Sequence, residues 1–533
     1  MTTRAFPDPA PHRGVAMSKA ADCIIEAGTV LRGVDANGVM RVEKDAALIV
    51  RGGRIAEIVA RDSVAARTDL PRHGGPGMIA MPGLVNAHHH FGLTPLMLGV
   101  PLAPLELWLP RFRGMRQVSA RLDTLYSAIE MLESGTTTVH HIHSGFTGAP
   151  ENWHATTSGV LSAYAEIGMR VGFSVMMRDR NTLTYRDDAE VLATLPPDLR
   201  AWLGPRLAAT KTPTTAYMDF FVEAKKKWQA EMGERIRFNL APANLHWCTD
   251  ESLELIFSTA RSEGANVHMH LVETARQAAY AQETYGRTAV AHLAAKGWLG
   301  PNVTLGHGNW MTREDLELVA GCGCAICHNA SSGLRLGSGI APVNQMRARG
   351  IPVALGIDQS NLVDDRDMTI EMKLVWALHR ETGLWNPRPD AAAVLQMATE
   401  HGAASTGFGG RTGRLEPGLE ADVVLMSEKA IGRPIIDPRT PVAEAVLHRG
   451  SKAAIDKVFV AGELVVDRGR VTRIDRDAVL EEIADSLSRP ASAEETEARA
   501  MIDRLMPYLE AFHKIHTAEP VLRPYRYNAM DEG

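Results

Sequence analysis

The chain has 533 residues, of which 45% are hydrophobic and 23% are charged, an ordinary globular composition with room for a large barrel and a smaller second domain. The formal net charge of −6 argues against a nucleic-acid-binding protein, because that function needs a clustered basic excess. No uncharged apolar run reaches about 18 residues, so the sequence predicts no membrane span.

The N-terminal segment, residues 1–20, contains prolines and arginines but no apolar signal core. It predicts a disordered leader and leaves open whether Met1 or Met17 is the true start. Five cysteines, an odd number without a signal peptide, indicate a cytoplasmic protein rather than a disulfide scaffold. The run GCGCAICHN is compatible with a metal cluster, but a short buried strand is favoured because no second cysteine group accompanies it. Its cysteines are Cys322, Cys324 and Cys327.

Short apolar runs separated by turn signals occur near both ends of the chain. Residues 21–60 include CIIEAGTVL and AALIVRGGRIAEIVA, with NG and GG as hairpin turns. A matching pattern returns in residues 418–472, in GLEADVVLM and KVFVAGELVVDRGRVT. The two ends together predict a small composite β-sandwich domain formed by residues 21–77 and 411–476.

The central region alternates apolar runs with helical patterns such as DTLYSAIEMLESG and DESLELIFSTARSEG. Eight such strands predict an α/β fold, a (β/α)8 TIM barrel over residues 78–410, although the links around the seventh strand leave little room for helices. Residues 477–533 predict a helical C-terminal extension that packs on the barrel or on a neighbouring subunit. The expected strands are Met78–His90, Gly135–His143, Arg170–Met177, Ile236–Pro242, Asn266–Glu273, Asn302–His307, Gly323–His328 and Ile351–Asp358.

Unusual polar residues stand at the ends of four of these strands, where a barrel carries its chemistry. In an extended strand His88 and His90 share one face and His89 points away. A lone histidine at a strand end is more often a hydrogen-bonded core residue, but the conjunction of several favours a metal site, because buried unpaired polar groups cost several kcal/mol each. The set comprises His88, His90, His268, His270, Glu273, His307 and Asp358.

Several motifs resemble those of the amidohydrolase superfamily: PGLVNAHHHFG, SGTTTVHH, VHMHLVET, LGHG, HNASSGLRLGSG, ALGIDQSN and LEPGLEADVVLM. The chain is most similar to the branch of cytosine and guanine deaminases, adenosine-derivative deaminases and triazine hydrolases. The resemblance covers roughly residues 21–472. The motifs are specific for the superfamily and poorly specific for the substrate.

The resemblance implies a mononuclear metal site with His88, His90, His270 and Asp358 as ligands. It also implies catalytic roles for three residues: Glu273 as proton shuttle, Asp358 as base and His307 as the group that polarises the attacked atom. The strand-four motif NLAPANLHW lacks the carboxylated lysine of binuclear branches. Imidazoles with one carboxylate suit Zn²⁺, which we favour, or Fe²⁺.

Four further residues are expected to bind substrate. Asn244 stands in the strand-four motif where many relatives carry histidine, and His328 opens HNASSG where many relatives read His-Cys-Pro-x-Ser-Asn. His141 either contacts substrate or fills the barrel mouth, and Trp108 lies in the long loop after the first strand. These departures put a standard substrate such as guanine or cytosine in doubt.

The leading hypothesis is a metal-dependent hydrolase that cleaves a C–N bond, by deaminating an N-heterocycle or by hydrolysing an amide or urea. Hydrolytic removal of chloride or an alkylamine from an aromatic N-heterocycle is the chemical alternative. A non-catalytic scaffold is the alternative from another class, but such proteins typically lose metal ligands. A small-molecule substrate and a homo-oligomeric assembly are expected, with neither nucleic acid nor membrane as a partner.

Overall fold

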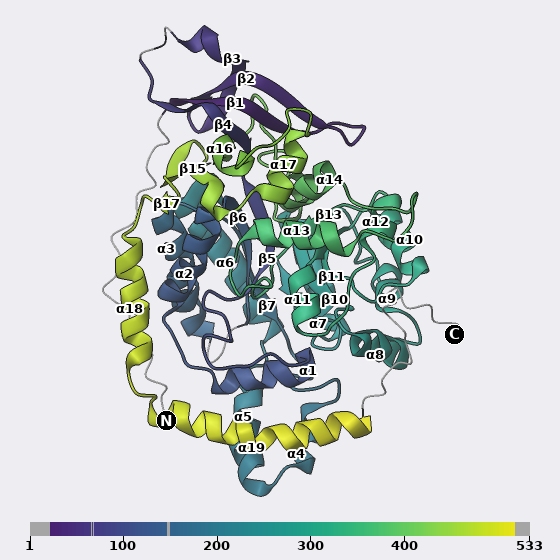
Figure 1. Cartoon of the computed structure of the whole chain (residues 1–533). Coiled ribbons are helices and arrows are strands. Elements are labelled where there is room, and N and C mark those ends of the chain that lie inside the picture. The colour runs from purple at the N-terminus through teal and green to yellow at the C-terminus, as the bar shows by residue number, and fades with distance from the viewer. Residues whose placement is uncertain (1–21, 66, 68, 146–149, 517–533) are drawn as a thin grey trace.

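The computed structural model describes residues 22–65, 67, 69–145 and 150–516 (Figure 1). The expected leader and the aromatic tail after residue 516 lie outside the described residues. None of the helices in the described ranges is long and apolar enough to cross a membrane.

A β-rich domain formed by both chain ends lies at one end of the molecule (Figure 1). Its strands follow the hydrogen-bonded order β17-β16-β15-β14-β4-β1-β2-β3, so β14 joins the C-terminal strands to β4 of the N-terminal part. Side chains from both halves, such as Leu48 and Phe459, pack into one buried cluster, because the sheet curves over its own core. The strands are β1 (Cys23–Val34), β2 (Met40–Arg51), β3 (Arg54–Ala60), β4 (Arg72–Pro82), β14 (Val423–Ser427), β15 (Ile455–Val460), β16 (Glu463–Asp467) and β17 (Arg470–Val471).

Two parallel sheets form the interior of the (β/α)8 region, in the orders β5-β6-β7-β8 and β10-β11-β12-β13. Single bridges connect the sheets at both edges, between Leu240 and Val267 and between His89 and Asp358. The strand ends that carry the predicted site therefore meet. The strands are β5 (Leu84–His89), β6 (Thr136–His143), β7 (Arg170–Met177), β8 (Ile236–Phe238), β9 (Ala241–Pro242), β10 (Val267–Leu271), β11 (Val303–His307), β12 (Ala325–His328) and β13 (Val353–Leu355).

The first expected strand, Met78–His90, is wrong as a single element. Its first half belongs to β4 of the β-rich domain, and only β5 belongs to the parallel sheet. Gly83 separates the two, and a Cβ there would lie 2.1 Å from Oγ1 of Thr137. The chain thus crosses between domains at the point where only glycine fits against β6.

Helices surround the parallel strands (Figure 1). The links around β12 do contain helices, which resolves the uncertainty of the sequence pattern there. The longer helices of this layer are α2 (Ala120–Glu133), α3 (Trp153–Ile167), α6 (Thr214–Met232), α7 (Asp250–Glu263), α8 (Ala275–Tyr285), α9 (Ala289–Ala295), α10 (Arg313–Cys322), α13 (Met368–Leu378) and α17 (Val442–Arg449). The shorter ones are α11 (Ala330–Arg335), α12 (Val343–Ala348), α14 (Ala391–Gln396), α15 (Gly402–Ser405) and α16 (Glu428–Gly432).

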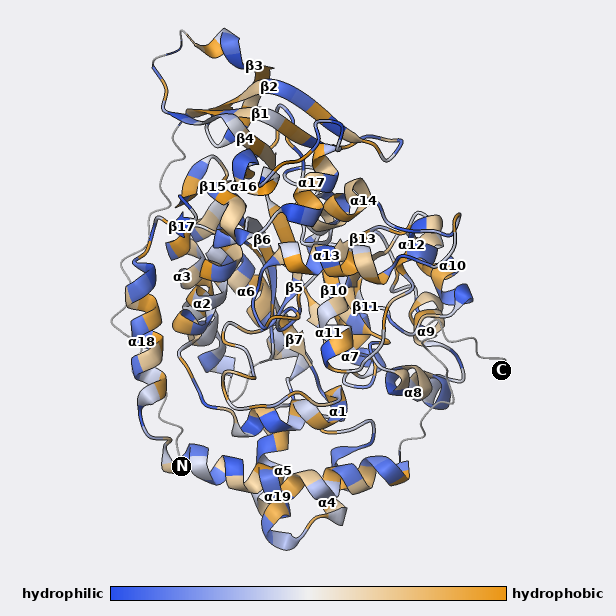
Figure 2. Ribbon diagram, viewed as in Figure 1, coloured by the Kyte–Doolittle hydropathy of each residue, from blue (hydrophilic) through white to orange (hydrophobic). Residues whose placement is uncertain are grey.

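The C-terminal helices run along the molecule and then across the end opposite the β-rich domain (Figure 1). They are α18 (Arg476–Ser488) and α19 (Ala493–His516), and α19 alternates hydrophilic and hydrophobic residues along its length (Figure 2). The apolar side of α19 packs on α4 (Asp188–Thr194) and α5 (Pro197–Ala208) through Leu505, Leu509 and Phe512. It also contacts the loop after β5, which contains α1 (Leu105–Trp108) and η2 (Leu109–Gly114). The extension therefore supports the loops over the strand ends.

Candidate metal centre

Three imidazoles from two strands meet at the C-terminal ends of β5 and β10. Nε2 of His90 lies 3.0 Å from Nε2 of His88 and 3.1 Å from Nε2 of His270. Strand alternation explains this meeting, because His88 and His90 are two residues apart and face inward together. All three side chains are buried.

Asp358 brings a carboxylate to the same point from the loop after β13. Its Oδ1 lies 3.4 Å from Nε2 of His90 and 3.8 Å from Nε2 of His88. The backbone fixes this position, because the Asp358 N–H donates to the His88 carbonyl oxygen over 2.8 Å. The Ser332 hydroxyl donates to Oδ2 over 2.5 Å, which leaves Oδ1 directed at the histidines.

These four donors fit a divalent ion. Ligand atoms around tetrahedral zinc at about 2.0–2.1 Å lie about 3.3 Å from one another, close to the separations of the three imidazole nitrogens and Oδ1. Without an ion, ring nitrogens facing one another across such distances leave lone pairs that no proton donor satisfies, which is costly in a buried site. A divalent cation would satisfy all of them together.

The protonation states also suit a metal site. Burial, reinforced by the neighbouring imidazoles, holds the pKa of His88 and of His270 well below the usual value of 6.5. Burial lowers the pKa of His90 as well, although Asp358 opposes that shift. The histidines are therefore neutral at physiological pH, and neutral imidazole is the form that binds metals.

Glu273 and His307 lie beside the four donors. Glu273 Oε2 is 3.7 Å from Nε2 of His307, and the two side chains form one buried group with Asp358. Burial, aided by the charges of Asp358 and Glu106, raises the pKa of Glu273 well above 4.5. Burial lowers the pKa of His307 to about 4. A protonated carboxyl thus stands next to a neutral imidazole, an arrangement suited to general acid chemistry.

Backbone strain is concentrated at the same strand ends. Val272, His307 and Asp358 have φ angles of 43°, 70° and 65°, in the left-handed region that non-glycine residues rarely adopt. Such residues persist only where surrounding contacts fix them, and they cluster at functional sites. Of the three, His307 and Asp358 belong to the buried group at the site, and Val272 directly precedes Glu273.

Hydrogen bonds from several residues hold Glu273, and the sequence analysis did not identify these residues. The Gln277 side-chain oxygen accepts from the Glu273 N–H over 2.8 Å, and Asn309 Nδ2 donates to the Glu273 carbonyl oxygen over 2.9 Å. The Ser338 hydroxyl lies 3.4 Å from Oε1. Gln277 lies in α8, and Asn309 and Ser338 come from two separate loops, so no single spacing in the sequence reveals the set.

His89 of β5 and His141 of β6 face the surrounding helices. His89 Nε2 lies 3.2 Å from the Ser127 hydroxyl of α2, away from the metal ligands, as strand alternation predicts. His141 Nδ1 lies 2.9 Å from the Tyr164 hydroxyl of α3. Alternation along β6 directs His140 inward and His141 toward the helices, and substrate contact by His141 stays a prediction.

The other expected substrate contacts are engaged within the protein. Asn244 Nδ2 donates to the side-chain oxygen of Gln277 over 2.9 Å, so Asn244 supports the residue that holds Glu273. Nε2 of His328 lies 2.9 Å from Nε2 of His379, and His328 is fully buried. Trp108 is buried in an apolar cluster with Leu105 of the same helix. Direct substrate contact by these three residues stays a prediction.

The clustered cysteines are free thiols with different surroundings. Cys322 ends α10, Cys324 precedes β12 and Cys327 lies within that strand, so the buried strand is shorter than expected. Cys327 approaches His88 and His268, a second combination of potential donors. Burial raises the pKa of the Cys327 thiol well above 9.0.

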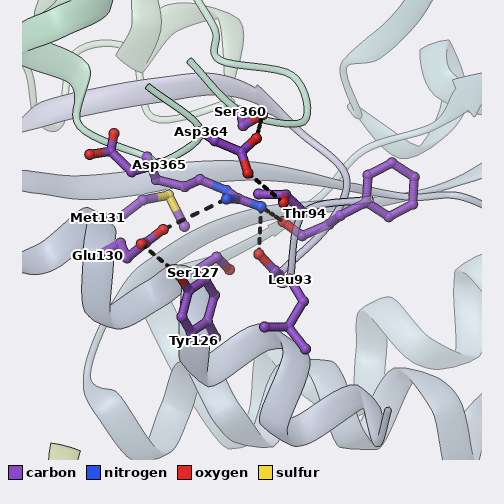
Figure 3. Close-up of polar contacts among 12 residues, drawn as sticks. Leu93, Thr94, Tyr126, Ser127, Glu130, Met131, Ser360, Asp364 and Asp365 are labelled. Carbon is purple, nitrogen blue, oxygen red and sulfur yellow. Dashed lines mark hydrogen bonds and ion pairs between the residues drawn. The ribbon is translucent and has the colours of Figure 1, made fainter. Parts of the chain in front are cut away.

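Polar contacts tie the loop after β13 to the loop after β5. Asp364 accepts from the Thr94 hydroxyl over 2.8 Å and from the Ser360 hydroxyl over 2.9 Å (Figure 3). Arg366, which is fully buried, donates to the carbonyl oxygen of Phe91 over 2.8 Å. The two loops that carry ligands from the first and last strands are thereby held together.

Comparisons with known proteins agree with this architecture. The model of the amidohydrolase family matches residues 79–465. The chain is 28% identical over 469 residues to a 5-methylthioadenosine/S-adenosylhomocysteine deaminase of Pelotomaculum thermopropionicum, covering 87% of this chain and 97% of the relative. It is 29% identical over 440 residues to an 8-oxoguanine deaminase of Pseudomonas aeruginosa, covering 81% and 92%.

Solved structures share the fold. An adenosine deaminase from Xanthomonas campestris with bound zinc has a TM-score of 0.71 at 24% identity, covering 91% of this chain and 99% of that protein. Atrazine chlorohydrolase from Arthrobacter aurescens, complexed with zinc, has a TM-score of 0.73 at 22% identity, covering 87% and 100%.

Proposed function

The chain belongs to the amidohydrolase family, and from this premise we propose that it is a metal-dependent hydrolase that cleaves a C–N bond of a small N-heterocyclic substrate by deamination. The observation that carries the proposal is the meeting of three neutral imidazole nitrogens and one carboxylate beside the protonated carboxyl of Glu273. This set of groups is typical of active sites that carry out metal-assisted hydrolysis.

The ligands in this proposal are His88, His90, His270 and Asp358, and they hold one divalent ion per chain. Zinc is favoured over iron, because a neutral imidazole set with one carboxylate suits its tetrahedral preference. When bound, the ion acts as a Lewis acid that makes water a competent nucleophile near neutral pH.

The protein's own groups move the protons. Water attacks an sp² carbon of the substrate, and a carboxylate oxygen of Asp358 accepts the proton that the water loses. Glu273 donates its proton to the leaving nitrogen, the C–N bond breaks and ammonia departs, which leaves a hydroxyl group on the ring carbon. The proton of this hydroxyl moves to the ring nitrogen to give the carbonyl product, and the proton taken up by Asp358 restores Glu273. His307, placed 3.7 Å from Glu273, stabilises the charge that develops on the attacked group.

Removal of chloride or an alkylamine from an aromatic ring remains the competing chemistry. A leaving nitrogen must be protonated, whereas chloride leaves as the anion without a proton. The raised pKa of Glu273 keeps a proton available and so favours the nitrogen leaving group. The scaffold alternative is disfavoured because a non-catalytic relative has no need to keep four convergent donors.

The test combines elemental analysis with ammonia release over a panel that includes methylthioadenosine, 8-oxoguanine, adenine derivatives and aminotriazines. We expect about one zinc per chain and ammonia release from at least one heterocycle. Asp358→Asn should lose both activity and metal, and the outward-facing His89→Ala variant is the control that keeps both. Two ions per chain would contradict the mononuclear site, and chloride release without ammonia release would favour dechlorination.

A further inference from the structure

His268 lies two residues before His270 on β10 and faces the same interior, yet it is not among the four metal donors. Its Nε2 lies 2.8 Å from Nδ1 of His88, and both side chains are buried. The contact is on the side of the His88 ring opposite to Nε2, the atom directed at His90. His268 therefore contacts the ligand His88 at the ring nitrogen that does not face the metal site.

His90 shows what a ligand of this site needs on its outer nitrogen. Nδ1 of His90 lies 2.7 Å from the carbonyl oxygen of Ile142, which can only accept. Nδ1 must then carry the proton, and Nε2 keeps the lone pair that a metal requires. His88 has no such carbonyl, so its tautomer depends on the ring of His268.

We propose that His268 is a positioning residue of the metal centre: its Nε2 accepts a hydrogen bond from the Nδ1–H of His88 and so fixes the tautomer and orientation of that ligand. This inference rests on the proposed metal-dependent function. It explains why a buried polar side chain occupies this position of β10, two residues before the ligand His270 and on the same face of the strand.

Glycine 306 provides the space for this pair. A Cβ at Gly306 would lie 3.1 Å from Cε1 of His88 and 3.3 Å from Nε2 of His268. At these distances the two rings would have to move by a few tenths of an ångström to admit the methyl group of an alanine. The glycine of the LGHG motif thus allows the two imidazoles to meet.

The acceptor is a neutral imidazole, where many metal sites place a carboxylate behind a histidine ligand. An imidazole nitrogen that carries no proton can accept a hydrogen bond in the same way. A carboxylate would push electron density onto the ligand more strongly. An imidazole partner therefore fixes His88 and reduces the Lewis acidity of the ion less than a carboxylate partner would.

His140 offers a matched control. Its ring centroid lies 4.8 Å from that of His268, and it is fully buried on β6. Its Nε2 lies 3.1 Å from the Ser174 hydroxyl, and no contact with a metal donor is recorded among the described residues. Loss of His140 removes an equally buried imidazole without removing the acceptor behind His88.

The test measures zinc affinity by competition with a chromogenic chelator in the full-length protein and three variants. In His268→Leu no acceptor remains, and we expect affinity to fall about 10–100-fold, the usual cost of losing such a partner. In His268→Gln the amide oxygen can take the place of Nε2 and should restore affinity to within about threefold of the unmodified protein. His140→Leu should bind zinc with unchanged affinity, even if its melting temperature falls.

Cobalt substitution provides a second readout, because the visible absorption of bound Co²⁺ reports ligand geometry. We expect an altered band in His268→Leu and an unaltered band in His268→Gln and His140→Leu. Unchanged affinity and band in His268→Leu would overturn the inference, as would an equal loss in His140→Leu. A second zinc in the unmodified protein that His268→Leu loses would make His268 a ligand instead. Absence of any zinc in the unmodified protein would overturn the proposed function and this inference together.

Discussion

Replacement of Glu371 by glutamine should change how the stability of the protein depends on pH. Glu371 lies on α13 and is fully buried, and its carboxylate accepts from the Ser331 N–H over 3.0 Å and from the Ser331 hydroxyl. Burial raises its pKa from 4.5 to about 7, even though the bonds from Ser331 oppose the shift. The folded protein therefore keeps a proton on Glu371 over a pH range in which the unfolded chain has lost it.

The sign and size follow from this difference. A raised acid pKa stabilises the folded state fully below pH 4.5, and that contribution is lost as pH rises through about 7. The shift of roughly 2.5 units corresponds to about 3 kcal/mol at 1.36 kcal/mol per unit. The glutamine of Glu371→Gln cannot titrate. As the pH is raised from 4 to 8, the free energy of unfolding of this variant should therefore increase by about that amount relative to the unmodified protein.

Urea unfolding at a series of pH values measures this relative change, because groups common to both proteins cancel in the difference. Glu283→Gln, which replaces an exposed carboxylate on α8, is the control and should leave the pH profile unchanged. Parallel stability profiles for the unmodified protein and Glu371→Gln would refute the reasoning. They would mean that the buried carboxyl titrates at its ordinary pKa.

Four further predictions concern the metal centre. Glu273→Gln cannot deliver a proton, so kcat should fall about 10²–10⁴-fold while zinc content and melting temperature stay unchanged, and near-full activity would exclude the proton shuttle. Because its raised pKa keeps Glu273 protonated, activity should fall as pH rises through that pKa, and a kcat profile that instead rises throughout would contradict this sign. His89→Ala should keep its zinc in elemental analysis and His90→Ala should lose it, since only His90 faces the other donors. Replacing the three clustered cysteines, Cys322, Cys324 and Cys327, together by serine should leave the zinc content unchanged. A loss of zinc would restore the hypothesis of a cysteine metal cluster.

Much of the fold could be predicted from the sequence, because parallel strands buried on both faces appear as continuous apolar runs. Their alternation with helical patterns indicated the (β/α)8 arrangement, and the β runs at both ends indicated the second domain. The error at Met78–His90 has a physical reason. Both halves are buried apolar strands, so hydrophobicity cannot mark the point at which the chain leaves one sheet for another, and only Gly83 marks the crossing.

The site could be predicted in part for a similar reason. Residues at strand ends converge once the barrel topology is assumed, so the meeting of His88, His90 and His270 required only strand order and alternation. The residues behind them could not be predicted in this way. The partner of His88 is His268, 180 positions away, and the contact depends on the angle at which β5 and β10 pass each other. Sequence spacing carries no information on that angle.

Alternation also explains where the histidines of β6 lie. His140, His141 and His143 are close in the sequence, but adjacent residues of a strand point to opposite faces. His140 occupies the interior, and His141 bonds to Tyr164 in the helical layer. In a run of histidines at a strand end, alternate residues therefore face the interior of the barrel, and the others contact the surrounding helices.

The cost of this centre links its chemistry to the stability of the fold. Neutral imidazoles and carboxyl groups are buried together, three left-handed residues are strained, and each feature opposes folding when nothing binds there. Hydrogen bonds from the helices that follow β12 and β10 offset this cost: Ser332 of α11 bonds to Asp358, and Gln277 of α8 bonds to the backbone of Glu273. A bound ion adds the remaining stabilisation, because it binds the folded state far better than the unfolded chain. The hydrogen bond to Gln277 thus positions Glu273, while burial and the charges of Asp358 and Glu106 raise the pKa of its carboxyl and so favour the protonated form beside the reacting atoms.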